Sequence, residues 1–363
     1  MLRISKATAY NWKRLESDVT EKLTTRANKT QSHKRVTASN YLCTPQASAL
    51  LNIVQDADYP IENIMYTLVC SVLAHKGLIQ KPHVQNFLSQ YHLDCLDIDI
   101  PQDTWDTEED ILGFVYQSLL TEGEKNATGQ YYTPRNVVEY ILKGMTLDKG
   151  ETFLDPCCGS GAFLMGVQTD TPENLYGFDI SNIAVMIATT NLLIKYHNKV
   201  FCPNIFCMDY LDKSMFAAQK WAGLPYKYNH IYTNPPWGSD KAGRYTGCCP
   251  LTNTKERASM VIAESLTHLQ ENGTSYFLLP TSLLKTKSHS NIRKHILSST
   301  SIQRIDLYNN RFDGVFTDYF GIKVCTAKTM EQKYIVTNNA QSTAITLSKK
   351  DYRRWEHRNQ YAL

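Results

Sequence analysis

The chain has 363 residues, of which 42% are hydrophobic and 20% charged, and its net charge is +3. This composition is typical of a globular protein with a substantial core, and the length accommodates one large α/β domain beside a smaller one. No stretch approaches the roughly 20 continuous apolar residues of a membrane helix, and the N-terminus lacks the apolar run of a secretory signal. These features argue against a membrane-spanning or secreted protein and predict a cytoplasmic one, whereas the weak charge neither requires nor excludes nucleic acid.

Ten cysteines are present, and none belongs to a Cys-x-x-Cys pair. No group of cysteines and histidines has the spacing of a structural zinc site. We therefore expect reduced thiols in the core of a cytoplasmic protein, and no bound metal.

Residues 1–40 form a polar and basic N-terminal segment. Five cations gather in it: Lys22, Arg26, Lys29, Lys34 and Arg35. Residues 4–15 resemble the recognition helix of a helix-turn-helix module, with Ser5 as the N-cap. No helix can precede this one, so we favour a capped helix that docks through Tyr10 and Trp12. Its partner is DNA, another subunit or the protein's own helical domain.

Residues 41–125 are predicted to form a helical domain. Apolar side chains recur there at helical spacing: Ile64, Met65, Leu68, Val69, Val72 and Leu73, then Ile111, Leu112, Val115 and Leu119. Pro60 cannot continue a helix, and it marks a turn between two of them.

From residue 126 to about 330, short apolar strands alternate with helical stretches. The predicted strands are 152–154, 175–178, 205–208, 230–233, 273–279 and 302–307. The predicted helices between them are 161–167, 183–196, 259–270 and 289–297. Alternation at this spacing predicts an α/β fold with a doubly wound parallel sheet. We interpret residues 331–363, which are polar, as a short C-terminal tail.

The segment Asp155-Pro156-Cys157-Cys158-Gly159-Ser160-Gly161 follows a predicted strand and has the features of a nucleotide-binding loop. Its glycines allow the backbone to turn tightly and to approach a ligand closely. A second acid, Asp179, ends the next strand 24 residues later, near the roughly 20-residue offset of a ribose-binding acid. On its own, this pair of acids would equally suit a nicotinamide or flavin nucleotide.

The turn is not Gly-x-Gly-x-x-Gly, which weakens the dinucleotide interpretation. It resembles the cofactor loop of S-adenosylmethionine-dependent DNA methyltransferases. A third acid, Asp209, ends the third predicted strand and is a candidate for binding the amine of the cofactor's adenine. The alternative for Asp209 is an ordinary helix cap or loop acid.

The segment Asn234-Pro235-Pro236-Trp237 follows an apolar strand and is the candidate catalytic loop. Two consecutive prolines end the strand and hold the backbone rigidly. An adenine amine is a poor nucleophile because its lone pair is delocalised into the ring. The Asn234 side-chain oxygen and the Pro235 carbonyl can accept its two N–H bonds, and Trp237 can stack on a flipped base. The alternative is a plain proline turn with an apolar tryptophan.

The third motif is Thr128-Gly129-Gln130-Tyr131-Tyr132-Thr133-Pro134, ahead of the glycine turn and the Asn-Pro-Pro-Trp loop. Together the three resemble adenine-N6 DNA methyltransferases of restriction–modification systems in the gamma arrangement, over about residues 110–330. Type I modification subunits and related type II enzymes are the most similar. The resemblance implies a Rossmann-like methyltransferase sheet, S-adenosylmethionine as cofactor and adenine in duplex DNA as substrate. By itself, Thr133-Pro134 is also an ordinary helix entry.

The resemblance also implies roles for single residues. Tyr132, Thr133 and Pro134 would contact the methionine end of the cofactor. The glycine turn would hold the same end through Asp155, Pro156, Cys157, Gly159 and Gly161. Asp179 would bind the ribose hydroxyls, and Asp209 the adenine.

Near His289, some relatives place an aromatic side chain that packs on the target base. His289 can do so here, and the alternative is a surface histidine at a helix start. Gamma-type enzymes that act alone carry a large target-recognition domain, whereas about 35 residues follow Lys328. We therefore expect a separate specificity chain that recognises the DNA sequence, with a restriction subunit as a further partner.

Three other functions compete with this interpretation. Enzymes that methylate RNA bases or protein glutamine also use Asn-Pro-Pro-aromatic loops, because each presents a planar conjugated amine. A non-catalytic assembly subunit would keep the fold without the chemistry, which intact Asn234, Asp155 and Asp179 disfavour. An NAD-dependent oxidoreductase lacks support, since the loop offers no acid or base for hydride transfer.

Overall fold

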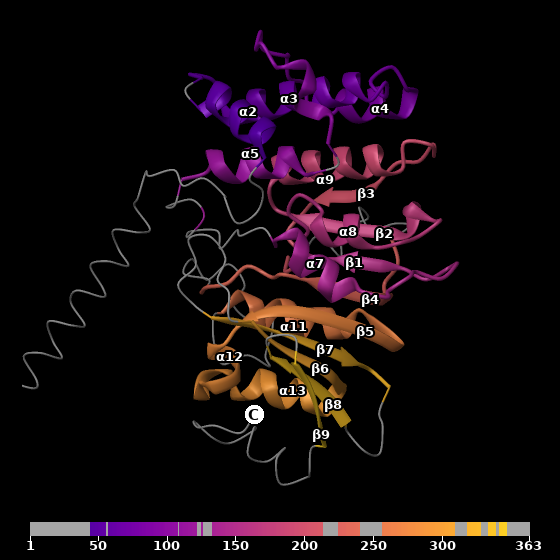
Figure 1. Ribbon diagram of the computed structural model, residues 1–363. Helices are drawn as coiled ribbons and strands as arrows, with labels where there is room; N and C mark the ends of the chain where they lie inside the picture. The colour runs from indigo at the N-terminus through magenta and orange to yellow at the C-terminus, as the bar shows by residue number, and fades with distance from the viewer. Residues whose placement is uncertain are drawn as a thin grey trace, which may run out of the picture.

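The structure is a computed structural model that describes residues 44–55, 57–107, 109–121, 125, 133–212, 224–239, 256–308, 318–327, 333–338 and 341–346. A twisted sheet lies at its centre, and the N-terminal helices lie beyond the β3 end of that sheet (Figure 1). The basic segment 1–40 and its candidate helix lie outside the described residues. No helix within the described ranges is both long and apolar enough to cross a membrane.

The described strands form one sheet in the order β3-β2-β1-β4-β5-β7-β6-β8-β9. Their bounds are β1 Phe153–Asp155, β2 Leu175–Asp179, β3 Asn204–Cys207, β4 Tyr228–Thr233, β5 Leu269–Pro280, β6 Ser301–Tyr308, β7 Tyr319–Cys325, β8 Lys333–Asn338 and β9 Gln341–Thr346. Strands β1 to β5 are parallel, and β7 is antiparallel to both β5 and β6. The order reverses between β1 and β4, which is where open α/β sheets bind ligands. The predicted doubly wound α/β fold is confirmed.

Both faces of the sheet are buried, and alternate residues of β5 show this. Tyr276 and Leu278 pack toward α7 (Arg135–Leu142), α8 (Ala162–Gly166) and one side of α9 (Asn182–Lys195). Phe277 and Leu279 pack toward α11 (Arg257–Thr267) and α13 (Ser290–Ser299). A strand covered on both faces needs a continuous apolar run, which residues 276–279 supply.

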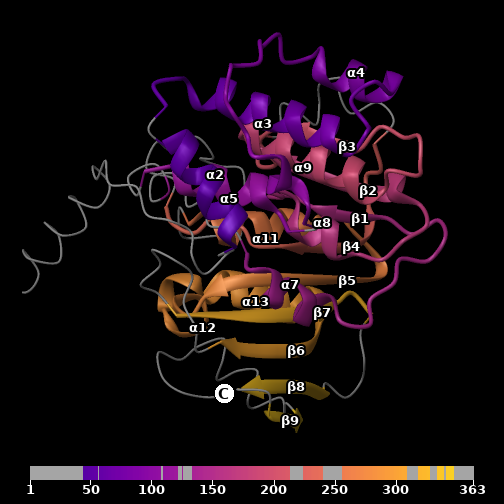
Figure 2. The same cartoon turned by 45° about the horizontal axis from the view of Figure 1, so that its top comes forward.

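The N-terminal helical layer consists of α2 (Pro45–Gln55), α3 (Ile61–His75), α4 (Pro82–Leu88), the 3₁₀ turn η1 (Gln102–Trp105) and α5 (Ile111–Leu119). Helices thus occupy the region where helical periodicity predicted them, and Pro60 immediately precedes α3. The layer shares its apolar core with α9, which contributes Ala184, Met186, Ile187 and Leu193. Figure 2 shows α5 beside α9, between the outer helices and the sheet. The boundary of a separate helical domain near residue 125 stays a prediction.

All six predicted strands are present, but the sheet is larger than predicted. Strand β7 was missed because Gly321 and Lys323 interrupt its apolar run; Gly321 is needed because a Cβ there would clash with the Tyr276 ring. Strands β8 and β9 extend the sheet into residues 333–346, which corrects the interpretation of this segment as a tail. These strands pair through backbone hydrogen bonds, which a polar sequence permits and apolar periodicity does not reveal.

Candidate active site

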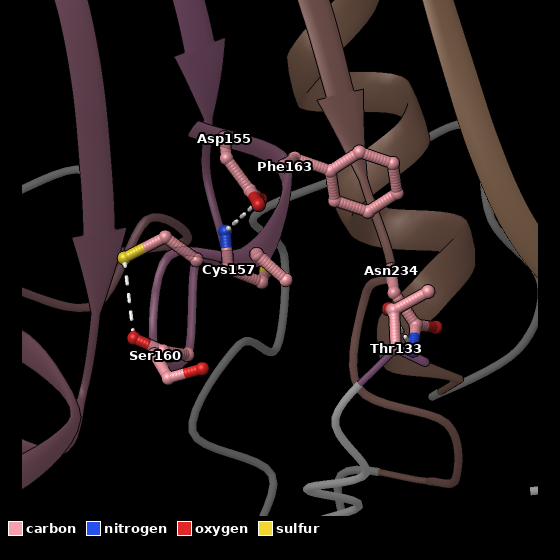
Figure 3. Close-up of a pocket in the computed structure, with 9 residues that line it drawn as sticks. Thr133, Asp155, Cys157, Ser160, Phe163 and Asn234 are labelled. Atoms are coloured by element: carbon pink, nitrogen blue, oxygen red, sulfur yellow. Dashed lines mark hydrogen bonds between the residues drawn. The ribbon is translucent and has the colours of Figure 1, made fainter. Parts of the chain in front are cut away.

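The predicted motifs meet at the carboxyl edge of the parallel strands. Strand β1 ends at Asp155 and pairs with both β2, which ends at Asp179, and β4, which runs into Asn234. A pocket opens at this edge (Figure 3). Its lining residues are Thr133, Asp155, Cys157, Cys158, Gly159, Ser160, Ala162, Phe163 and Asn234. Parallel strands therefore bring together three motifs that are far apart in the sequence.

The glycine turn wraps around the Asp155 carboxylate. The Cys157 N–H donates to Asp155 Oδ1 at 3.1 Å. Gly159 and Gly161 have φ angles of 53° and 89°, in the left-handed region that favours glycine. A Cβ on Gly161 would lie 3.2 Å from that of Ala188 in α9, so the turn also needs glycine for close packing.

Asp179 closes the other side of the same turn. Its Oδ2 accepts from the Gly159 N–H at 3.0 Å, and its Oδ1 accepts from the Ser181 N–H at 2.9 Å. Burial raises the pKa of Asp155 to about 7 and also raises the pKa of Asp179. Asp155 lines the pocket, and Asp179, on the other side of the same turn, is partly buried. Two carboxyl groups with raised pKa values beside one turn favour a ligand with cationic or hydrogen-donating groups, because such a ligand stabilises their charged form.

The candidate catalytic loop is linked to the Thr-Pro motif. Asn234 Nδ2 donates to Thr133 Oγ1 at 3.2 Å across 101 positions of sequence, and Thr133 is buried. This bond uses the amide nitrogen as a donor, so the side-chain oxygen is the atom suited to accept from an amine. Trp237 Nε1 donates to the Leu278 carbonyl at 3.3 Å, and its ring centre lies 6.1 Å from that of Tyr319.

Replacing Thr133 with valine should misorient the Asn234 amide, because valine has the same shape without an acceptor. We expect the reaction rate that depends on Asn234 to fall about 10-fold, the effect of losing one positioning hydrogen bond of about 1.4 kcal/mol. Thr133→Ser keeps the acceptor and should retain most of the activity. Single-turnover rates of both variants measure this; equal losses in the two would show that the bond has no such role.

Several predicted site residues are placed less directly. Tyr132 lies outside the described residues, and Pro134 immediately precedes α7. Asp209 follows β3, and its Oδ1 accepts from the Leu211 N–H at 3.0 Å, a turn contact of the kind expected for a loop acid. Asp209 is not among the residues that line the pocket, so its role toward adenine stays a prediction.

His289 is buried rather than exposed at the surface. It ends the 3₁₀ turn η4 (Lys287–His289) after α12 (Ser282–Lys285), and its Nδ1 lies 3.4 Å from the Ser259 hydroxyl of α11. Burial, reinforced by the Arg293 cation, lowers its pKa, which favours the neutral ring. The alternative of a surface histidine is therefore wrong, while contact with a target base stays a prediction.

The pocket includes side chains that the sequence did not single out: Cys158, Ser160, Ala162 and Phe163. All four lie in or next to the glycine turn, so the motif itself was the signal that could have found them. The sequence also did not single out Ile180, an apolar side chain outside the pocket lining that is 46% exposed directly after Asp179. Within the described ranges, no three His, Cys, Asp or Glu side chains are grouped to hold a metal ion.

Comparison with known proteins agrees with this geometry. The sequence profile of the family N-6 DNA Methylase matches residues 107–350. The Type II methyltransferase M.VspI of Vibrio sp. (strain 343) is 31% identical over 223 residues, which are 58% of this chain and 51% of that protein. The Type I restriction enzyme EcoEI methylase subunit of Escherichia coli is 25% identical over 237 residues, 60% of this chain and 45% of that protein. The chain thus spans about half the length of these relatives.

The fold is also found among solved structures. The structure of the Type IIL restriction-modification enzyme MmeI in complex with DNA superposes with a TM-score of 0.60 at 14% identity. It covers 86% of this chain and 60% of that one. At this identity the likeness concerns the fold alone, and it supports the sheet order described above.

Proposed function

The chain belongs to the N-6 DNA methylase family, and on that premise we propose that it methylates the N6 amine of adenine in duplex DNA. S-adenosylmethionine would be the methyl donor. The observation that carries the proposal is the contact between Asn234 and Thr133 beside the glycine-turn pocket. This contact lies beside the pocket, and it supports a role for the Asn234 side-chain oxygen as the acceptor for a planar amine and for the pocket as the site of a cationic cofactor.

The residues of the pocket fit S-adenosylmethionine. When bound, the cofactor supplies a methyl group on a cationic sulfur, so the protein needs no strong base to activate the acceptor amine, which would lose a proton to solvent as the new C–N bond replaces the S–C bond. The carboxyl groups of the buried Asp155 and of the partly buried Asp179 can balance positive charge and accept hydrogen bonds. Gly159 and Gly161 leave the turn without side chains where the backbone must approach the ligand. We assign the methionine end of the cofactor to the turn and the ribose hydroxyls to Asp179.

The catalytic loop would act by orientation and by accepting hydrogen bonds. The Asn234 side-chain oxygen and the Pro235 carbonyl would accept hydrogen bonds from the two N–H groups of the target amine. These bonds would keep the lone pair of the amine directed at the methyl group. Holding the two reacting atoms in line accounts for most of the rate enhancement in such a site. Trp237 would stack on the flipped base, and its bond to Leu278 fixes the plane of the ring.

We further propose that the protein works with partners in the cytoplasm. The EcoEI relative is, by its name, one subunit of a Type I restriction enzyme. By analogy, a separate specificity chain would recognise the DNA sequence, and a restriction subunit would complete the system. RNA bases, protein glutamine and a role without catalysis are less favoured, because the family is that of the N-6 DNA methylases and the two relatives are named as a methyltransferase and a methylase subunit.

Transfer of labelled methyl groups to mixed-sequence duplex DNA tests the proposal, with and without proteins encoded nearby. We expect label on adenine N6. Label that requires a second protein would support the specificity chain, and label with this chain alone would contradict it. RNA and release-factor protein, tested in parallel, should stay unlabelled; transfer to either one and not to DNA would contradict the proposal.

A further inference from the structure

Helix α5 joins the helical layer to the pocket, and all nine of its residues are buried. Part of its surface belongs to the apolar core that it shares with α2, α3 and α9. Another face carries Asp110, the N-cap residue, with Gly113 and Tyr116 at three-residue spacing. Residues three apart lie on one side of a helix, so these three can contact the same neighbour. We call them the α5 brace.

Asp110 connects the brace to the glycine turn through Asn191 of α9. Asp110 Oδ1 accepts from the Gly113 N–H at 2.8 Å, which caps the helix, and from Asn191 Nδ2 at 3.0 Å. The same Asn191 nitrogen donates to the Ser160 carbonyl at 3.1 Å. A single amide therefore fixes the start of α5 against the turn that lines the pocket.

Gly113 brings the helix backbone directly onto the turn. A Cβ at this position would clash first with Asp110 Oδ2, and it would also lie 2.8 Å from Asp110 Cγ and 2.9 Å from Ser160 Oγ, closer than real side chains pack. Glycine weakens a helix relative to alanine, so its presence in the interior of α5 calls for another reason. Close approach to Ser160 supplies that reason.

Tyr116 connects the brace to the second loop of the pocket. Its hydroxyl lies 2.9 Å from the Ser181 hydroxyl. Ser181 caps α9 by accepting from the Ala184 N–H, and its own N–H donates to Asp179 Oδ1 at 2.9 Å. The brace therefore contacts both the glycine turn, which follows the pocket residue Asp155, and the loop that follows Asp179.

We propose that the α5 brace positions the glycine turn and the Asp179 loop for cofactor binding, so that the helical layer and the cofactor pocket form one coupled unit. Asp110, Gly113 and Tyr116 are positioning residues, since they act through Ser160 and Ser181. A preorganised loop binds more tightly because less ordering is left to the moment of binding. Ligand binding should in turn stabilise α5, since coupling between sites is reciprocal. The identity of the ligand rests on the proposed function.

Binding of S-adenosylhomocysteine, measured by calorimetry, tests the brace without requiring any methyl transfer. We expect Gly113→Ala to raise Kd at least about 10-fold, because the added methyl group displaces both Ser160 and the Asp110 carboxylate that accepts from Asn191. Tyr116→Phe keeps the ring packing and loses only the hydroxyl, and we expect a rise of about 3- to 10-fold. Hydrogen exchange of α5 amides should slow on binding in the wild type and less so in the variants.

Thr67→Val is the matched control. Thr67 is a buried hydroxyl of the same helical layer that donates to the Asn63 carbonyl and accepts from the Leu96 N–H, away from the pocket. It should lower Tm and leave Kd unchanged. If both brace variants bind S-adenosylhomocysteine as tightly as the wild type, or if Thr67→Val loses as much affinity as they do, the coupling is overturned and the proposed function is not. A wild-type chain that binds no S-adenosylhomocysteine would overturn the proposed function and the brace with it.

Discussion

Asn234→Ala is expected to lower kcat for methyl transfer by about 10²- to 10³-fold, the range found when one transition-state hydrogen-bonding group is removed. The variant loses the acceptor for the target amine and also the bond to Thr133. The dissociation constant of S-adenosylhomocysteine should change little, because the glycine turn and Asp179 would hold that ligand. Single-turnover transfer to duplex DNA and calorimetry on the same preparation separate the two effects.

Asn229→Ala provides a control on the same strand. Asn229 lies near the start of β4, and its Oδ1 accepts from the Thr152 N–H at 3.0 Å. This change removes an asparagine from the opposite edge of the sheet, so it should lower stability and leave kcat within about twofold, as expected for a residue without transition-state contacts. Equal losses in the two variants would mean that Asn234 acts only through folding.

Asp155 should make the stability of the protein depend on pH. Its pKa is about 7 in the folded chain against a usual 3.8, so the folded state binds the proton more tightly. The stability is therefore greatest below pH 4 for this group and falls as pH rises toward 7, because the buried carboxylate must then ionise. The shift corresponds to at most about 4 kcal/mol between the two limits.

Asp155→Asn removes this ionisation and keeps an oxygen that can accept from the Cys157 N–H. The unfolding free energy of the variant minus that of the wild type should therefore be larger at pH 8 than at pH 5. Urea denaturation of the two ligand-free proteins at pH 5 and at pH 8 measures how this difference changes with pH. Contributions from other titrating groups largely cancel in the comparison. Parallel pH dependence in the two proteins would contradict the assignment to Asp155.

The sequence was sufficient to predict the parallel part of the sheet, where apolar runs and the polar residues that end them occur together. Strands β1, β2 and β4 each end in a polar residue after an apolar run, and all three were placed within a few residues. Parallel pairing then requires Asp155, Asp179 and Asn234 to share one edge of the sheet, so their proximity follows from the sequence pattern. The antiparallel β7 and the outer pair β8 and β9 carry no comparable signal, since their pairing depends on backbone contacts.

The details of the site depended on contacts that no local pattern encodes. The bond from Asn234 to Thr133 spans 101 positions, and it engages the nitrogen of the Asn234 amide as a donor. His289 begins a helix in a polar stretch, yet α11 covers it, so its burial depends on a neighbour from elsewhere in the chain. Gly113 lies in a segment with an apolar helical pattern, and only its close packing against Asp110 and Ser160 distinguishes it from a tolerated glycine.

Helix α9 has two apolar sides, and this limits which segments can be recombined between related proteins. One side, with Met186 and Ile187, belongs to the core of the helical layer, and the other, with Val185 and Leu192, belongs to the core of the sheet. A chimaera joined at residue 125 would set the α9 of one parent against the helices of another, creating mismatched volumes in a close-packed core. Recombination between relatives should therefore be tolerated only where α9 and the helices that cover it come from the same parent.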